Sequence, residues 1–240
     1  MVTDAPDPIP AASLIVLRDT DTGPEVLMVE RASTLAFAAG ALVFPGGRID
    51  PADHALAERM TGAREDLVAR IAAIRETIEE AGLTIGIDPA LAVHRAALLA
   101  GEAADALLPP DAFDLDALVP FARWLPLGLS HRIFDTRFYL AVAPDRAAAS
   151  PDGGENVRAF WARPADVLAS GARIIFPTQR NLERLAMHDS VAGAMADAAA
   201  RPARTITPWV ENRDGSPHLC IPDDLGYPVT AEPVAEAQRG

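Results

Sequence analysis

Three glutamates, Glu76, Glu79 and Glu80, lie within a span of five positions. If this segment is helical, Glu76 and Glu80 are one turn apart and Glu79 lies beside them, so the three carboxylates share one face. Carboxylates this close repel each other, and a hard divalent cation removes that repulsion. Oxygen ligands alone favour Mg²⁺ or Mn²⁺ over zinc. The cluster therefore indicates a metal site, although for these residues alone a solvated acidic helix face is the alternative.

The helix that must carry the glutamates is well marked in the sequence. We expect it to run from about Arg64 to Ala81, with Gly82 as a left-handed cap. Arg75 is four positions before Glu79 and can orient that carboxylate. On the opposite face, within a sector of about 60°, lie the large apolar residues, which are Leu67, Ile71, Ile74 and Ile78.

Other elements are needed to position this helix. A Pro45-Gly46-Gly47 turn ends a short strand, and a helix with Asp50 as its N-cap should run from Pro51 to about Met60. Apolar and β-branched runs predict strands at 12–17, 26–29, 41–44, 121–127, 133–142 and 157–162. We expect short helices in an insertion at 88–116, helices over 178–200, strand-like pieces at 205–210 and 218–221, and a frayed C-terminal end.

A longer motif surrounds the glutamates. Residues 75–83, Arg-Glu-Thr-Ile-Glu-Glu-Ala-Gly-Leu, resemble the core of the Nudix box, and residues 44–50, Phe-Pro-Gly-Gly-Arg-Ile-Asp, resemble the strand and turn that begin the same box. Arg75 follows Gly47 by 75 − 47 = 28 positions, about fourteen more than in the usual box. The glutamate expected eight positions before the arginine falls on Leu67. Asp53 is the nearest stand-in, and we assign it no role.

The stretched box is similar to that of the acyl-coenzyme A diphosphatase branch of the Nudix superfamily. The runs at 132–140, 161–164 and 176–182 resemble the same branch, so the resemblance extends from about residue 13 to residue 185. The coenzyme A signature before the glycine turn matches only in part. Leu27, Arg31 and Gly40 fit it, whereas the second expected arginine falls on Ala36.

The resemblance implies an α/β fold, the Nudix α/β/α sandwich with a mixed sheet, a helical insertion and a short C-terminal extension. The Nudix domain would span residues 1–200, with insertions at about 51–66 and 88–116, and the extension residues 201–240. The implied activity is Mg²⁺- or Mn²⁺-dependent hydrolysis of a diphosphate linkage in a nucleoside diphosphate derivative. Coenzyme A or acyl-coenzyme A is the leading substrate. An ADP-ribose or dinucleotide diphosphatase and a non-catalytic nucleotide sensor remain alternatives.

The same resemblance implies the site residues. Glu76, Glu79 and Glu80 would bind the metal with the Gly46 carbonyl, and Glu79, Glu80 and the loop residue Glu155 would be catalytic. Glu155 can equally be a solvated loop residue. Arginine suits bidentate phosphate contacts, although each single arginine can instead be a surface or structural ion-pair residue. The expected substrate-binding arginines are Arg31, Arg132 and Arg137.

Composition narrows the function classes further. Asp and Glu number 34 against 21 basic residues, all of them arginine, so the net charge is 21 − 34 = −13. This balance disfavours nucleic acid and anionic membranes as partners. A single cysteine, Cys220, excludes an intramolecular disulfide, and the histidines show no paired ligand spacing. We expect a cytoplasmic protein with a small-molecule nucleotide as its partner, and a homodimer is a permitted assembly.

Overall fold

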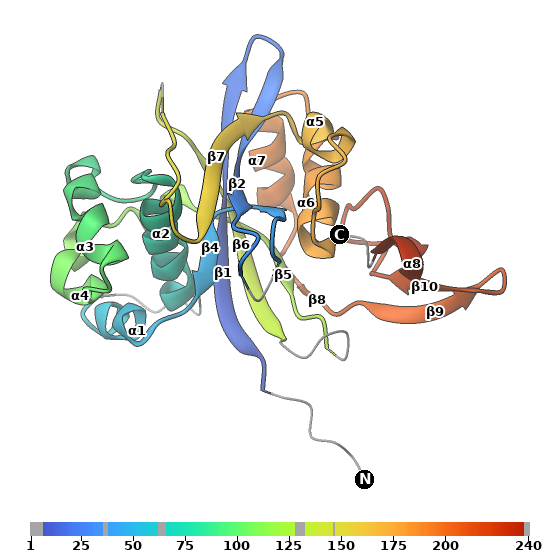
Figure 1. Cartoon of the computed structure of the whole chain (residues 1–240), viewed down its shortest axis with the longest axis horizontal. Helices are drawn as coiled ribbons and strands as arrows, with labels where there is room; N and C mark the ends of the chain where they lie inside the picture. Colours follow the sequence, from blue (N-terminus) through green and yellow to red (C-terminus); the bar gives the residue numbers. More distant parts are fainter. Residues whose placement is uncertain (1–6, 36–37, 62–65, 128–132, 146, 238–240) are drawn as a thin grey trace.

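The computed structural model describes residues 7–35, 38–61, 66–127, 133–145 and 147–237. Within these ranges eight strands form one sheet at the centre of the molecule (Figure 1). Its order is β3-β2-β1-β6-β5-β8, with β4 paired to β1 and β7 paired to β2. The strands are β1 (Ile9–Thr20), β2 (Gly23–Arg31), β3 (Leu42–Val43), β4 (Gly46–Arg48), β5 (Val119–Trp124), β6 (Phe134–Val142), β7 (Asn156–Ala162) and β8 (Thr205–Ile206). The pairs β1–β6 and β5–β8 are parallel and the other pairs antiparallel, so the sheet is mixed.

Helices cover both faces of this sheet (Figure 1). On one side lie α1 (Pro51–Glu58), α2 (Leu67–Ala81), α3 (Arg95–Leu99) and α4 (Ala104–Leu107), with 3₁₀ turns at Pro89–His94, Pro110–Ala112 and Leu115–Ala117. On the other side lie α5 (Pro164–Ala169), α6 (Phe176–Leu185) and α7 (Val191–Ala200). The predicted α/β/α sandwich with a mixed sheet and a helical insertion is therefore confirmed.

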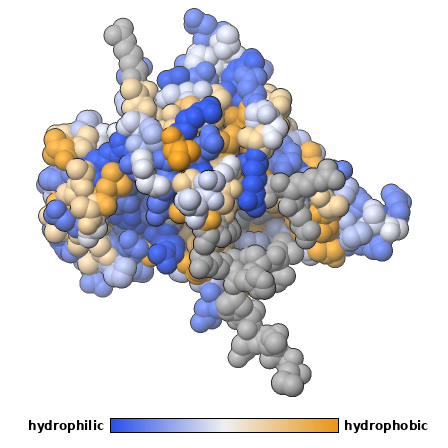
Figure 2. All heavy atoms as spheres, in the orientation of Figure 1, coloured by the Kyte–Doolittle hydropathy of each residue, from blue (hydrophilic) through white to orange (hydrophobic). Residues whose placement is uncertain are grey.

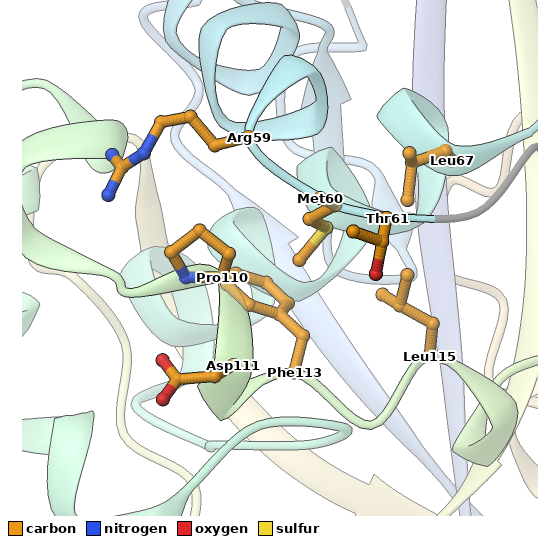
Figure 3. A pocket seen from close by; sticks show the side chains of 8 residues that line it. All are labelled: Arg59, Met60, Thr61, Leu67, Pro110, Asp111, Phe113 and Leu115. Carbon is orange, nitrogen blue, oxygen red and sulfur yellow. The ribbon is translucent and has the colours of Figure 1, made fainter.

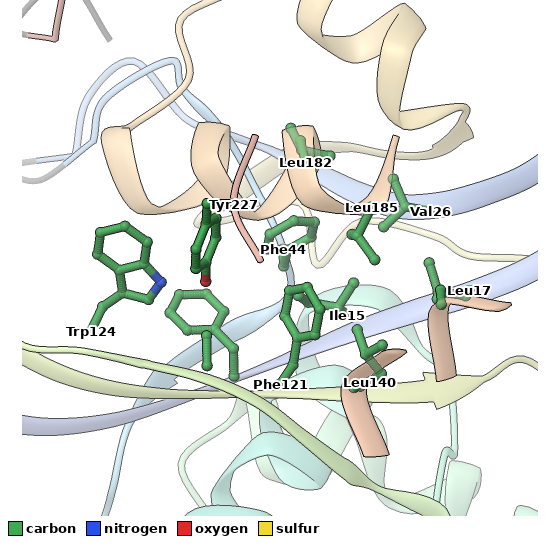
Figure 4. Close-up of a cluster of buried hydrophobic side chains, with 14 of the residues drawn as sticks. Ile15, Leu17, Val26, Phe44, Phe121, Trp124, Leu140, Leu182, Leu185 and Tyr227 are labelled. Atoms are coloured by element: carbon green, nitrogen blue, oxygen red, sulfur yellow. The ribbon is translucent and has the colours of Figure 1, made fainter. Parts of the chain in front are cut away.

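The alternation of side chains along β1 explains the two layers. Leu14 and Val16 pack with α2 in one cluster of buried residues, whereas Ile15 and Leu17 belong to the other. Figure 4 shows this second cluster, in which residues from the sheet meet Leu182 and other residues of α6. Both faces of the central strand are thus buried, which fixes α2 against the sheet.

The glutamate-bearing helix ends where the sequence predicts. Gly82 caps α2 with a left-handed φ of 70°. Ile71, Ile74 and Ile78 are fully buried on its inner face. The helix begins at Leu67, and residues 62–65, where its predicted start falls, lie outside the described ranges.

Two local predictions were wrong. Gly46–Arg48, expected to be part of a turn, pairs with β1 as the short strand β4. The predicted strand at 205–210 is divided, because β8 joins the main sheet whereas β9 (Trp209–Arg213) begins a separate sheet of order β11-β10-β9. The helix α5 was not expected. It begins at Pro164, the last residue of the run at 161–164 that resembles the acyl-coenzyme A diphosphatase branch.

The prediction of a frayed C-terminal end was wrong for the described residues up to 237, because this segment packs against α6. This part of the chain forms β10 (Ser216–Cys220), β11 (Ala231–Pro233) and α8 (Val234–Ala237). Tyr227 is buried and donates a hydrogen bond to Oδ1 of Asn181 at 2.9 Å. Glu232 accepts one from the buried Arg180 at 2.8 Å. The extension therefore contributes to the main core, while the proposed boundary at residue 200 stays a prediction.

Within the described ranges, no helix has the length and apolar character that crossing a membrane requires.

Candidate active site

Glu80 is tied to two strands at once. Its Oε2 accepts a hydrogen bond from the backbone N–H of Gly46 on β4 at 2.8 Å, and its Oε1 accepts one from Nδ2 of Asn156 on β7 at 2.8 Å. The residue is only 5% exposed. The glutamate face of α2 therefore points toward β4 and β7. It is not a solvated acidic helix face, which was the alternative to a metal site.

The glycine pair of β4 makes this approach possible. A Cβ on Gly47 would lie 2.4 Å from Oε1 of Glu76, so the carboxylate of Glu76 rests directly on the glycine backbone. Gly46 has φ +156°, and a Cβ there would lie 2.5 Å from the carbonyl oxygen of Ala12 on β1. Glycine at both positions allows the strand and the helix to come into contact with Glu76 resting on the backbone.

Arg75 holds the other two glutamates. Its Nη1 donates to Oε1 of Glu76 at 2.9 Å and to Oε2 of Glu79 at 3.2 Å. This confirms the expected orienting contact with Glu79. The rest of the guanidinium faces Asp53 on α1, through Nε–Oδ1 and Nη2–Oδ2 contacts that are both 2.9 Å.

Asp53 is the site residue to which the sequence analysis assigned no role. It is fully buried, and its Oδ2 also accepts a hydrogen bond from the backbone N–H of Asp50 at 2.8 Å. It gives Arg75 a buried carboxylate partner, which Leu67 cannot provide. In the sequence, Asp53 is marked only by its position: it lies in the first turn of a helix that begins with Pro51, directly after the Pro45-Gly46-Gly47 turn.

Arg31 and Glu155 lie beside Glu80, as the prediction of a shared site requires. The Arg31 guanidinium is 3.8 Å from Oε1 of Glu80 and 3.7 Å from Oε2 of Glu155. The side chain of Glu155 is 68% exposed, so it reaches solvent at the edge of the site. Its loop is ordered by Asp152, whose carboxylate accepts the backbone N–H groups of Glu155 and Asn156.

The structure does not place the other two predicted substrate-binding arginines, Arg132 and Arg137, at the glutamates. Arg132 lies outside the described residues. Arg137 is on β6 opposite Ala12, and Ala12 in turn is opposite Gly47, so β1 separates Arg137 from the glycine turn. Its role in substrate binding stays a prediction.

Burial dominates the electrostatics of the glutamates. Desolvation raises the pKa of Glu76 to about 8, against the lowering effect of Arg75. It raises the pKa of Glu80 to about 7, against the hydrogen bonds from Asn156 and Gly46. Burial also raises the pKa of Glu79. For Arg75, burial lowers the pKa, but the Asp53 hydrogen bond and the surrounding carboxylates raise it above its usual value.

The chemistry of these donors fits a hard divalent cation. Three desolvated carboxylates with raised pKa values hold negative charge at a cost that a cation would remove. In the described part of the chain, no three acidic, histidine or cysteine side chains are already arranged around one cation position. The glutamates are instead satisfied by Arg75, Arg31 and amide donors, which a bound cation would partly replace.

On the molecular surface, hydrophilic residues gather between the insertion helices and β7, over α2 (Figure 2). A cavity of about 310 Å³ lies elsewhere, between the end of α1, the start of α2 and the insertion (Figure 3). Leu67 contributes to its wall and lies 76 − 67 = 9 residues before Glu76, about 14 Å along the helix. The cavity is therefore distinct from the glutamate site. It is lined by Arg59, Met60, Thr61, Leu67, Pro110, Asp111, Phe113 and Leu115.

Comparisons with known proteins agree with this geometry. The family model of the NUDIX domain matches residues 7–179. The crystal structure of a NUDIX hydrolase from Alicyclobacillus acidocaldarius is 29% identical, with a TM-score of 0.68, over 82% of this chain and 99% of that chain.

Two more distant structures carry the names of ligands or substrates. The NUDIX domain of Shewanella oneidensis NrtR complexed with ADP ribose is 17% identical, covering 74% of this chain and 86% of that one, with a TM-score of 0.45. A C. elegans Ap4A hydrolase is 16% identical, covering 67% and 84%, with a TM-score of 0.40. At these similarities neither bears on the substrate of this protein.

The family match covers both the glycine turn and the glutamate helix, and with the Alicyclobacillus structure it confirms the predicted enzyme class, a hydrolase acting on diphosphate bonds. The chain belongs to the NUDIX domain family.

Proposed function

We propose that the protein is an Mg²⁺- or Mn²⁺-dependent hydrolase that cleaves the diphosphate linkage of a nucleoside diphosphate derivative, with coenzyme A or acyl-coenzyme A as the leading substrate. The observation that carries the proposal is the convergence of Glu76, Glu79 and Glu80 on the Gly46-Gly47 backbone. A buried triple carboxylate at a backbone that can approach a ligand closely suits a metal-bound diphosphate.

Glu76, Glu79, Glu80 and the Gly46 carbonyl would hold the cation. When bound, such a cation neutralises diphosphate oxygens and lowers the pKa of a coordinated water. Arg75 and Asp53 keep the carboxylates of α2 in place before the substrate arrives.

Glu155 and Arg31 are assigned to the substrate side. The exposed carboxylate of Glu155 can accept the proton of the attacking water. At 3.8 and 3.7 Å the contacts of Arg31 with Glu80 and Glu155 are ion pairs longer than hydrogen bonds. We assign to its guanidinium a contact with a phosphate oxygen of the substrate, for which arginine is well suited.

Support for coenzyme A comes from the partial signature. Arg31, one of its three matching residues, lies beside Glu80. The intact set of three glutamates favours catalysis over a sensor that binds nucleotide without cleaving it. The alternative substrates, ADP-ribose and dinucleotides, share the diphosphate and so require direct comparison.

A hydrolysis screen tests the proposal. We expect Mg²⁺- or Mn²⁺-dependent cleavage of coenzyme A, compared with ADP-ribose, NADH and dinucleoside polyphosphates. Removing the 3′-phosphate should lower kcat/KM by roughly 10- to 150-fold, because a charged hydrogen bond contributes about 1.5–3 kcal/mol. Equal rates on dephospho-coenzyme A, or preference for ADP-ribose, would contradict the coenzyme A assignment. Nucleotide binding without cleavage at any metal concentration would favour the sensor.

A further inference from the structure

Asn156, the first residue of β7, is fully buried between α2 and the 152–155 loop. Its Nδ2 donates to Oε1 of Glu80 and to Oδ2 of Asp152, both at 2.8 Å. Because both partners are carboxylates, the amide orientation is fixed. The opposite orientation would place the amide oxygen against two acceptors.

The amide oxygen of Asn156, Oδ1, has a different environment from Nδ2. Oδ1 of Asn156 is buried and has no hydrogen-bond partner among the described residues. A buried acceptor without a partner costs stability, and an apolar side chain at this strand position would avoid that cost. The contribution of Asn156 is therefore its two donated hydrogen bonds.

These hydrogen bonds distinguish Glu80 from the neighbouring glutamates. Glu76 and Glu79 accept hydrogen bonds from the charged guanidinium of Arg75, whereas Glu80 accepts from the neutral groups of Asn156 and Gly46 at 2.8 Å and has its cation, Arg31, farther away at 3.8 Å. Neutral donors fix the orientation of a carboxylate without cancelling its charge. The negative charge therefore stays available for a metal ion.

The second partner of Asn156 links Glu80 to the loop that carries Glu155. Asp152 also accepts the backbone N–H groups of Gly154, Glu155 and Asn156, so its carboxylate closes the turn on which Glu155 stands. One amide therefore connects the proposed ligand on α2 with the turn that presents the proposed base.

We propose that Asn156 is a positioning residue of the active site, which orients the Glu80 carboxylate for the cation and keeps the Glu155 turn in place relative to α2. This inference rests on the proposed function. It assigns no contact between Asn156 and the substrate.

The test compares Asn156→Ala with a matched control, Asn181→Ala. Asn181 on α6 is also fully buried and also has one amide atom without a partner, but it bonds to Trp124 and Tyr227 in the other core cluster. Mn²⁺ affinity is measured by calorimetry or electron paramagnetic resonance, and kcat and KM by hydrolysis at saturating metal. We expect Asn156→Ala to lose about 10- to 100-fold in Mn²⁺ affinity and to lower kcat more than it changes KM. Asn181→Ala should keep both.

A second variant covers a failure of Asn156→Ala to fold. Asn156→Ser has one hydroxyl donor for two carboxylates, so we expect a smaller loss in the same two quantities. Wild-type Mn²⁺ affinity and kcat in either folded variant would overturn the inference and leave the proposed function standing. A wild-type protein that binds no Mn²⁺ would contradict the proposed function and the inference with it.

Discussion

Asp53 and Arg75, 22 positions apart in the sequence, form a buried two-point ion pair with both nitrogen–oxygen distances at 2.9 Å. Asp53 is fully buried and Arg75 is 4% exposed. The pair joins α1, which falls in the predicted insertion at about 51–66, to the helix that carries the glutamates. A buried pair of this kind is costly to break, because removing one partner leaves an uncompensated charge in the core.

We therefore expect Asp53→Ala to lower the free energy of unfolding by about 3 kcal/mol, at the lower end of the range for buried pairs because Glu76 and Glu79 still face Arg75. The same change should lower activity, since Arg75 would no longer be fixed. Chemical denaturation and metal-dependent hydrolysis measure the two effects. Asp166→Ala removes a bidentate but exposed pair with Arg163 and serves as the control, in which no measurable change is expected. Equal stability of the two variants would contradict the structural role of Asp53.

Asp53 also shows the limit of prediction from the sequence. The glutamate helix was predictable because four large apolar residues repeat at helical spacing and Gly82 terminates it. The position of Asp53 after the glycine turn made it a candidate, but its burial and its contact with Arg75 depend on how α1 packs on α2. Such a contact becomes visible only when the two helices are placed in space.

The C-terminal extension illustrates the same limit. Its proline-containing sequence predicted a frayed end, yet Tyr227 and Glu232 bond to Asn181 and Arg180 on α6. These are long-range contacts between polar groups, and periodicity does not report them. In contrast, the resemblance to the Nudix superfamily predicted that Arg31, Glu80 and Glu155 share a site, because it assigned each of them a role there, and the contacts of Arg31 with both glutamates agree with this.

The metal-free protein should lose stability as the pH rises. The pKa values of Glu76 and Glu80 are about 8 and about 7 in the native state, against an ordinary value of 4.5. Between pH 4.5 and 8 the native state therefore binds more protons than the unfolded state, so this contribution to stability is complete below pH 4.5 and is lost as the pH passes 8. Thermal unfolding with a chelator from pH 6 to 8.5 should show a steeper fall in Tm for the wild type than for Glu76→Gln. Parallel curves would contradict the raised pKa of Glu76.

The third prediction separates catalysis from folding. Glu80→Gln keeps the size of the side chain but removes a buried charge whose pKa is raised by desolvation. Glutamine can keep only one of the hydrogen bonds accepted from Gly46 and Asn156, and the loss of the buried charge offsets the other, so we expect the metal-free variant to be about as stable as the wild type near pH 8. Activity should fall by at least about two to three orders of magnitude, the scale of about 3–4 kcal/mol of transition-state stabilisation. Glu155→Gln, compared under the same conditions, lowers kcat strongly only if Glu155 is the base. Near wild-type turnover in Glu80→Gln would refute the metal-site assignment.

The two glycines of β4 give the last prediction, because the same substitution should affect metal binding at one position and stability at the other. In Gly47→Ala the new methyl group meets the carboxylate of Glu76, 2.4 Å away, and the flexible end of that side chain can move aside. We expect the fold and Tm to be nearly retained, while Mn²⁺ affinity and kcat fall because Glu76 is displaced.

In Gly46→Ala the methyl group meets the backbone carbonyl of Ala12 at 2.5 Å, with φ +156° adding strain, so β4 itself must shift. This variant should lose several degrees in Tm. Thermal unfolding and Mn²⁺ titration of both variants measure the contrast, and full Mn²⁺ affinity in Gly47→Ala would show that Glu76 does not need its place on the glycine backbone.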